Sequence, residues 1–410
     1  MKQFGILFRY ECSKLIRRKS FWITIVGVVL FYLFIVVLPL LQVTSTSNGQ
    51  GESYTVSYLD NIARDRENGL KLTGRRLDDE LLQEAENYVN ELEQNVNNMS
   101  TQEWEHASVR YNLLEWVVYR LTGEDLNFVG DSDNPANTMT EQEIYEKREQ
   151  WIDSMWKQNQ LTPKEREYWQ KKESTFEKPI RIQHYRFYQF LLEEDLPYGF
   201  LMSSFFVAMI IGQIFAEEHT RKMDQLILCS RLGRKTVYYA KILAGMVMTL
   251  AVNMFILVII IGTECLIYGT EGFDAILQQE VGWTSSTMTV GQAALIMICL
   301  QVVAALLTAI IVMVLSEWLG NRIAPMAFVV ASLFVAAAVV VPRAFRILSQ
   351  SWSYLPMNLV RLEEGICDVR LISIGQWQFT TWQFGPVLYL VLGILLVLLG
   401  KRLYCNYQVK

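Results

Sequence analysis

Between Glu217 and Lys241, charged and apolar residues alternate in a pattern that suits the docking of another protein beside a membrane. An apolar run ends at Ala216, the acidic pair Glu217 and Glu218 follows, and Lys241 opens the next apolar run. The residues between them include a basic set: Arg221, Lys222, Arg231, Arg234 and Lys235. Basic residues beside apolar spans mark the cytoplasmic side of a membrane protein. These residue types predict an electrostatic docking role and no bond-breaking chemistry.

The middle of this connector, residues 217–240, predicts a short amphipathic helix. Met223, Leu226 and Ile227 lie at positions i, i+3 and i+4, so they would form one apolar face. Arg231 and Arg234 would border that face with positive charge. An ordinary basic inner loop, which any membrane protein needs for its orientation, would show the same charges.

The sequence contains no motif for nucleotide hydrolysis or covalent catalysis. It lacks the Walker A pattern, the G-x-S-x-G elbow and the H-E-x-x-H helix. The three histidines, His106, His184 and His219, are far apart, which predicts surface or interface positions and no metal site. The six cysteines form no CxxC pair, and the sequence leaves open whether Cys265 and Cys367 pair. We therefore expect no enzymatic activity, no cofactor and no metal in this chain.

Composition and charge predict membrane spans together with one soluble part. Of the 410 residues, 51% are hydrophobic and 19% are charged, and the mean hydropathy is +0.18. Residues 43–195 carry 30 acidic and 17 basic residues, a net charge of −13, whereas the whole chain carries −5, so the remainder is net +8. This asymmetry favours an acidic domain outside and basic loops inside, and it does not indicate a nucleic-acid partner.

The predicted fold is an α-helical polytopic membrane protein with about six transmembrane helices. Residues 1–20 predict an amphipathic helix in the lipid headgroup region. Residues 21–42 predict the first span, because the apolar run is too long for a signal peptide and no small-x-small cleavage site follows it. The second span is expected over 196–216, starting cleanly at Pro197. The third to sixth lie within 241–410, over about 242–267, 290–315, 323–341 and from 384 or 387 to 399. Both termini would be cytoplasmic.

A large helical extracytoplasmic insertion is predicted over residues 43–195. Apolar residues recur every three or four positions from Leu77 to Val96, which is the period of an amphipathic helix. Three capping boxes mark helix starts: Ser100 with Glu103, Thr140 with Glu143, and Thr162 with Glu165. The tryptophans of this domain could line a substrate groove, but aromatic residues at helical spacing favour a core.

Several polar features accompany the later spans. Glu264 lies about 34 Å along its helix from Lys241, beyond a hydrocarbon core of roughly 30 Å, so we expect an interfacial carboxylate. Residues 269–289 predict a short polar outer loop. Residues 342–386 predict an aromatic outer segment, whose arginines are an exception to the positive-inside rule: Arg343, Arg346, Arg361 and Arg370.

In its order of elements, the connector resembles the segment between the second and third spans of ABC-2-type transporter permeases, the transmembrane subunits of bacterial ABC exporters. The shared order is an acidic pair at the end of a span, basic residues, a short amphipathic helix, serine and arginine, and a lysine that starts the next span. The match covers about thirty residues closely and the whole chain loosely. Many members have glycine and then proline where this chain has Lys222 and Cys229. The sequence YLPMNLV resembles the start of the short re-entrant helices near the outer mouth of these permeases.

The resemblance implies a permease subunit that forms a substrate pathway in the bacterial cytoplasmic membrane and docks on a separate ATP-binding subunit. ATP and Mg²⁺ would bind to that partner, and a second permease subunit, identical or different, would complete the pathway within the lipid. The implied ATPase-coupling residues are Glu217, Glu218, Met223, Leu226, Ile227, Arg231 and Arg234.

Two other function classes compete with this interpretation. One is a non-transporting membrane sensor or scaffold, in which the extracytoplasmic domain binds a ligand. The other is a secondary carrier, which usually needs buried ionisable groups and an inverted repeat, and the sequence indicates neither. No feature of the sequence names a cargo.

Overall fold

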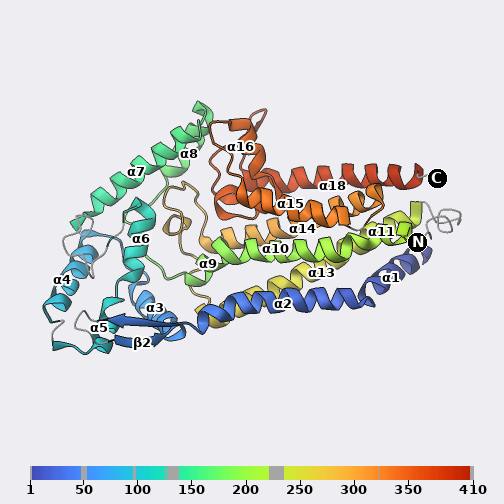
Figure 1. The fold of residues 1–410 in the computed structure, drawn as a ribbon. Coiled ribbons are helices and arrows are strands. Elements are labelled where there is room, and N and C mark those ends of the chain that lie inside the picture. The colour runs from blue at the N-terminus through green and yellow to red at the C-terminus, as the bar shows by residue number, and fades with distance from the viewer. Residues whose placement is uncertain are drawn as a thin grey trace. The chain divides into compact units, whose positions relative to one another are not determined.

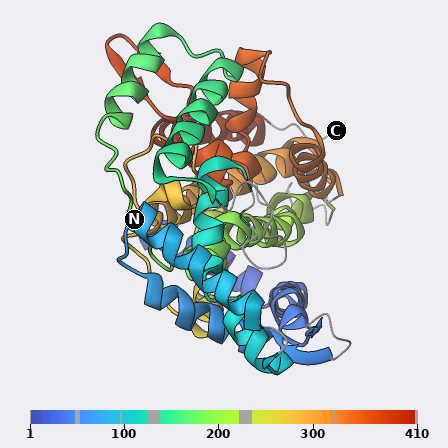
Figure 2. The same ribbon diagram turned by 90° about the vertical axis from the view of Figure 1, so that its left-hand side faces the viewer.

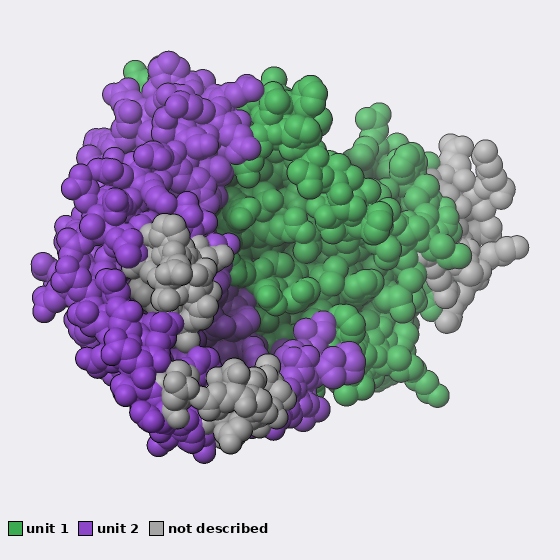
Figure 3. All heavy atoms as spheres, turned by 60° about the vertical axis from the view of Figure 1, so that its left-hand side comes forward, with its two compact units in different colours: residues 1–33, 192–261, 296–410 green, residues 34–191, 262–295 purple. Residues whose placement is uncertain are grey.

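The computed structural model describes residues 2–47, 53–95, 98–124, 126, 138–220, 235–321 and 323–406, and these residues are mostly helical (Figure 1). The chain forms two compact units (Figure 3). Unit 1 consists of Met1–Leu33, Leu192–Ile261 and Ile296–Lys410, and unit 2 consists of Phe34–Leu191 and Gly262–Leu295. The prediction of a helical protein is confirmed.

Five helices in the described part of the chain are long and apolar enough to cross a membrane. They are Lys19–Leu40 (α2), Arg186–Glu218, Lys235–Tyr268 (α13), Val290–Leu319 (α14) and Thr381–Asn406 (α18). Ile323–Ala338 (α15) is apolar but has only 16 residues, fewer than the roughly 20 that a span needs. The structure therefore supports a membrane protein, and the count of six spans stays a prediction.

The helix from Arg186 to Glu218 begins ten residues before the predicted start at Leu196. It comprises α9 (Arg186–Phe190), a π-helical turn, α10 (Leu196–Phe206), a second π-helical turn over Val207–Ile211 and α11 (Gln213–Thr220). Pro197 lies in the first turn of α10, as predicted, but the continuous helix begins earlier, at Arg186. Proline removes one helical hydrogen bond and crowds the preceding turn, and here the wider π-helical turn Leu191–Asp195 precedes it.

Unit 1 contains most of the length of each long apolar helix, and these helices run along one another in Figure 1. The N-terminal helix α1 (Lys2–Ile16) precedes α2, and α15 is followed by two short helices, α16 (Arg346–Ser353) and α17 (Pro356–Leu359). A π-helical turn over Leu362–Ile366 and a hairpin of β3 (Ile372–Ile374) and β4 (Trp377–Phe379) complete the segment before α18. The aromatic segment 342–386 therefore contains short helices and a hairpin. Whether it is re-entrant stays a prediction.

Arg370 explains part of the exception to the positive-inside rule. Its guanidinium is buried and donates to both carboxylate oxygens of Asp368, at 2.8 Å each. It also donates to the hydroxyls of Ser349 (2.6 Å) and Ser353 (3.1 Å) on α16. The charge is thus neutralised inside the protein, so this arginine adds no net positive charge to the segment.

Unit 2 is a mostly helical domain (Figure 2), whose helices pack around an apolar core. Its elements are β1 (Val43–Ser47), β2 (Ser53–Ser57), α3 (Tyr58–Leu72), α4 (Asp79–Asn95), α5 (Thr101–Ser108), α6 (Asn112–Thr122), α7 (Glu141–Gln158) and α8 (Pro163–Glu173). All three predicted capping boxes are present and start α5, α7 and α8. Trp156 and Trp169 are buried, as predicted for core aromatics, whereas Trp104, Trp116 and Trp151 are only partly buried. His184 is buried with its ring against Gly69, so it is not a surface residue.

Residues 269–289 form an irregular connection, as predicted for a loop, but most of the segment is buried within unit 2. The carboxylate of Glu280 is fully buried and pairs with Arg120 at 2.7 Å. The Tyr185 hydroxyl donates to the carbonyl of Gln279 at 2.7 Å. Gly282 lies so close to α6 that a Cβ atom there would be 1.9 Å from the carbonyl oxygen of Arg120. These polar groups of the segment are satisfied by partners inside the domain, and not by water.

Glu84 in α4 makes the stability of unit 2 depend on pH. Arg75 donates to this carboxylate at 2.6 Å and Tyr111 donates at 2.9 Å, and the Arg75 hydrogen bond is the main cause that lowers the pKa of Glu84. A carboxyl with a lowered pKa stabilises the fold above its unfolded pKa, about 4.3, and that stability is lost as pH falls through the folded pKa. We expect the difference in melting temperature between wild type and Glu84→Gln to be largest at neutral pH and to shrink below about pH 4.3. A difference that is constant from pH 7 to pH 3 would contradict this.

Candidate functional site

The predicted coupling residues are only partly within the described structure. Met223, Leu226, Ile227, Arg231 and Arg234 lie in residues 221–234, outside the described residues. Glu217 and Glu218 lie at the end of α11, directly before that segment, and Lys235 begins α13 directly after it. The structure therefore defines the two ends of the connector, and the role of its helix stays a prediction.

Glu217 and Glu218 do not face water at the end of their helix. Their exposed fractions are 8% and 6%, and basic side chains of α1 neutralise them. Arg18, just after α1, donates to Glu217 Oε2, and Lys14 Nζ lies 3.9 Å from both Glu217 Oε2 and Glu218 Oε1. The N-terminal helix is thus joined to the acidic start of the connector.

Lys241 completes this arrangement from α13. Its side chain is 0% exposed, and its ammonium lies 2.5 Å from Glu218 Oε1 and 3.9 Å from Glu11 Oε2. It also donates to the carbonyl of Ile214 at 3.1 Å and lies over the Phe215 ring, 5.3 Å from its centroid. A buried ammonium needs such partners, because an unpaired charge inside a protein costs several kcal/mol.

Together these groups form an ion cluster, defined here as the buried Glu11, Glu217, Glu218 and Lys241 with the partly exposed Lys14 and Arg18. Three acidic and three basic side chains make the ion cluster neutral in formal charge. Burial lowers the pKa of Lys14, and repulsion from Lys241 adds to this effect. Since removing one partner would leave another charge buried, α1, α11 and α13 are held in one arrangement.

Below the ion cluster, α11 is also tied to α14. A π-helical turn over Val207–Ile211, closed by the Gly212 amide donating to the carbonyl of Val207 at 3.0 Å, precedes α11. The Ser316 hydroxyl donates to the carbonyl of Gly212 at 2.5 Å and accepts from the amide of Ala216 at 3.1 Å. One side chain of α14 therefore satisfies backbone groups on both sides of Phe215.

An aromatic cluster links the same region to α18. The ring of Phe215 lies 5.7 Å from that of Tyr238 and 5.8 Å from that of Tyr404. Tyr238 also donates to the carbonyl of Val397 at 2.8 Å. Gly400 allows this approach, because a Cβ atom there would lie 2.5 Å from the Tyr238 hydroxyl. The two ends of the connector therefore contact helices from both ends of the chain.

Sequence reasoning identified Glu217 and Glu218 but missed their partners. Lys241 was interpreted only as the first residue of a span. Glu11, Lys14 and Arg18 occur at i, i+3 and i+7, the spacing of one helical face, and this pattern was a usable signal.

Two polar positions lie inside the apolar helices of unit 1. The Asn253 amide donates to the Ser203 hydroxyl at 2.6 Å, and the fully buried amide of Gln301 lies against Gly199. In unit 2, Glu264 is buried among protein atoms. Its place at the membrane interface stays a prediction. Among the described residues, no group of three or more His, Cys, Asp or Glu side chains is placed to hold a metal ion. Neither Cys265 nor Cys367 forms a disulfide in the described part of the chain.

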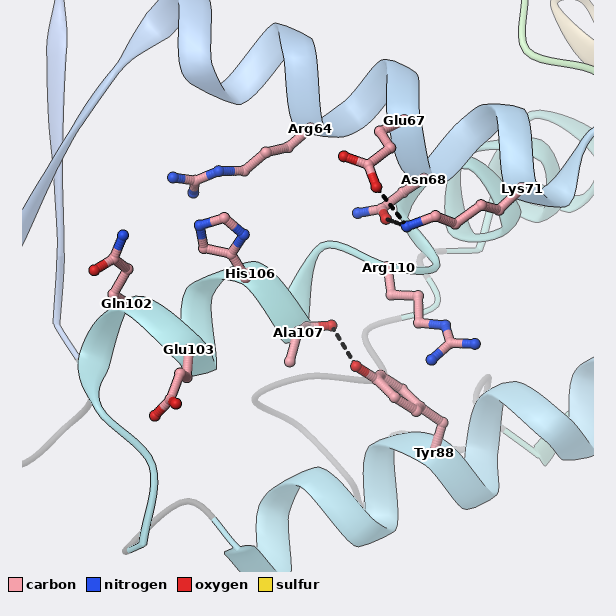
Figure 4. Close-up of a pocket in the computed structure, with 10 residues that line it drawn as sticks. All are labelled: Arg64, Glu67, Asn68, Lys71, Tyr88, Gln102, Glu103, His106, Ala107 and Arg110. Carbon is pink, nitrogen blue, oxygen red and sulfur yellow. Dashed lines mark hydrogen bonds and ion pairs between the residues drawn. The ribbon is translucent and has the colours of Figure 1, made fainter.

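A groove on unit 2 lies among α3, α4 and α5 and has a volume of about 690 Å³ (Figure 4). Its charged side chains are largely engaged within the groove. Lys71 pairs with Glu67 at 2.8 Å, and the Arg110 guanidinium lies over the Tyr88 ring, 4.5 Å from its centroid. Glu103 is occupied as the capping residue of α5. These contacts leave little uncompensated charge for a ligand.

No family model, no curated protein and no solved structure matches this chain.

Proposed function

We propose that this chain is the membrane-spanning permease subunit of an ATP-driven ABC-2-type exporter, which couples to a separate ATP-binding subunit through the connector. The ion cluster is the observation that supports this most directly. An ordinary inner loop needs only exposed basic residues for its orientation, whereas here buried ion pairs hold both ends of the connector and α1 together.

The ion cluster gives the proposed coupling a physical route. Force applied to the connector would act on the end of α11 and the start of α13, which Lys241 joins through Glu218. Separating these helices would expose buried charges to water or leave them without partners, so the helices would move together with α1. Ser316 would pass the movement of α11 to α14. A rigid group of helices of this kind suits the rocking motion of an exporter.

The same proposal includes the topology and the partners. The chain would cross the bacterial cytoplasmic membrane about six times with both termini in the cytoplasm, and residues 43–195 would lie outside. A second permease subunit would complete the pathway. ATP and Mg²⁺ would bind to the partner ATPase, with Met223, Leu226 and Ile227 as the docking face and Arg231 and Arg234 as its charged border.

Co-purification from native membranes tests this function. We expect the tagged protein in mild detergent to retain an ATP-binding subunit, and we expect Leu226→Asp and Arg231→Glu to abolish its recovery, because the first places a charge on the apolar docking face and the second reverses its border. Leu59→Asp and Arg166→Glu make the same chemical changes in unit 2, where Leu59 is half exposed. These two controls should retain the ATPase.

Absence of any ATP-binding subunit, from a preparation that stays monodisperse and helical, would overturn the proposal. The sensor or scaffold would then be the better hypothesis, and the ligand-sized grooves of unit 2 favour it over a secondary carrier. Equal loss of the ATPase in the connector variants and in the controls would show general unfolding and contradict a docking role for the connector.

A further inference from the structure

A second cleft on unit 2 is lined by four basic and three acidic side chains. It has a volume of about 570 Å³ and lies among the end of α8, residues 175–183 and the buried segment 274–288. Its basic lining residues are Arg76, Lys172, Lys178 and Arg181. The cleft is therefore a place to look for a ligand.

Arg76 and Arg181 are directly opposite each other across an antiparallel bridge. The amide of Leu77 donates to the carbonyl of Ile180 at 2.9 Å, and the amide of Ile182 donates to the carbonyl of Arg75 at 2.8 Å. These flanking hydrogen bonds make the two arginines a non-hydrogen-bonded pair, the kind in which the Cα atoms are about 4.5 Å apart and the side chains share one face. Both side chains line the cleft.

This arginine pair, Arg76 with Arg181, has no anionic partner in the described part of the chain. Like charges directly opposite each other in a ladder destabilise the fold, and a bound anion would offset this repulsion. Other basic side chains around the cleft have partners: Lys178 pairs with Glu149 at 2.6 Å, and Lys172 lies over the Tyr168 ring. The pair is thus distinct from its basic neighbours.

A second feature of the cleft also indicates a missing ligand. The Ser285 side chain lines it, is 2% exposed, and its hydroxyl has no hydrogen-bond partner among the described residues. A buried hydroxyl without a partner is costly, and native structures usually satisfy such groups with water, an ion or a ligand. The cleft is also lined by the carboxylates of Glu173, Glu177 and Asp274, of which Glu173 pairs with Arg148, so net charge alone does not set which ligand the cleft prefers.

We propose that this cleft binds a small ligand through an oxyanion group, a phosphate or a carboxylate, which the arginine pair holds and Ser285 helps to orient. Each guanidinium presents five N–H donors in a planar fork that matches the oxygens of such a group. An oxyanion between the two arginines replaces their mutual repulsion by two charge-assisted interactions. This site would give unit 2 a ligand-binding role that is independent of whether the membrane helices transport a substrate.

Titration of the full-length protein in detergent with inorganic phosphate and with succinate tests the proposal. Isothermal calorimetry should detect binding of at least one of them at constant ionic strength, and melting temperature should rise more than with chloride. Arg76→Gln and Arg181→Gln should each weaken the affinity roughly tenfold to hundredfold, as expected for loss of one charge-assisted contact. Phosphate tests for recognition of a phosphate group and succinate for recognition of a carboxylate. Binding of either anion supports the site.

Arg166→Gln in α8 removes the same charge at a residue that does not line the cleft and should bind like wild type. Because Arg76 and Arg181 are exposed, we expect the folds of all three variants to survive, and helix content by circular dichroism checks this. Hydrogen exchange at residues 74–77 and 180–182 should slow when the anion is added to wild type only. If neither anion exceeds chloride, or if Arg166→Gln weakens binding as much as Arg76→Gln, the proposed site is wrong. Neither result bears on the connector or on the ATPase.

Discussion

Replacement of Lys241 by methionine is expected to lower the free energy of unfolding by about 3–5 kcal/mol, because it leaves Glu218 and Glu11 buried without their shared cation. Methionine preserves most of the side-chain volume and its contact with Phe215, so the loss should come mainly from charge. Equilibrium unfolding of the full chain in detergent would measure it. Hydrogen exchange should increase in α1 and at the end of α11, the two elements that Lys241 holds.

Two further variants separate loss of charge from general damage to α13. Lys235→Met removes an exposed lysine of the same helix and should change stability little, since exposed charges contribute little. The double variant Lys241→Met with Glu218→Gln also removes one of the carboxylates left without a cation, and it should recover part of the lost free energy of unfolding. If Lys241→Met is as stable as Lys235→Met, the ion cluster does not hold these helices together.

Replacement of Arg148 by methionine is expected to destabilise unit 2 by a similar amount, about 3–5 kcal/mol. Arg148 in α7 is 0% exposed, pairs with Glu173, and donates to the carbonyls of Gly282 (2.8 Å) and Thr284 (3.1 Å). The variant would leave both carbonyls without a donor in the interior. The attachment of residues 269–289 to the helical domain should weaken first.

Hydrogen exchange by mass spectrometry resolves this effect in the full-length protein. In Arg148→Met, peptides covering residues 269–289 should exchange faster, whereas those in α14 should change little. Arg166→Met in α8 makes the same substitution at a residue that makes none of these contacts, and it should match wild type. Unchanged exchange in residues 269–289 of Arg148→Met would show that these hydrogen bonds do not hold the segment.

The elements that depend on neighbouring residues were predictable. The capping boxes of Thr140 and Thr162 and the apolar period of α4 involve residues at most a few positions apart, and the structure confirms them. The apolar runs also predicted the membrane-length helices, because burial in lipid requires about twenty apolar residues in sequence. Helix starts were less accurate: Pro197 indicated a start, but π-helical turns let the helix continue through it.

The sequence by itself therefore determined the helical class, the apolar helices and the caps of unit 2, since these arise from contacts within one or two turns. Only the tertiary structure decided which charges meet. Glu217 is 199 positions from Arg18, and Arg148 is 134 positions from Gly282. The spacing of residues carries no information about such pairs, because packing of the helices brings them together. For the same reason a polar segment such as residues 269–289 can be a solvated loop or part of a core, and the partners that satisfy its polar groups decide which it is.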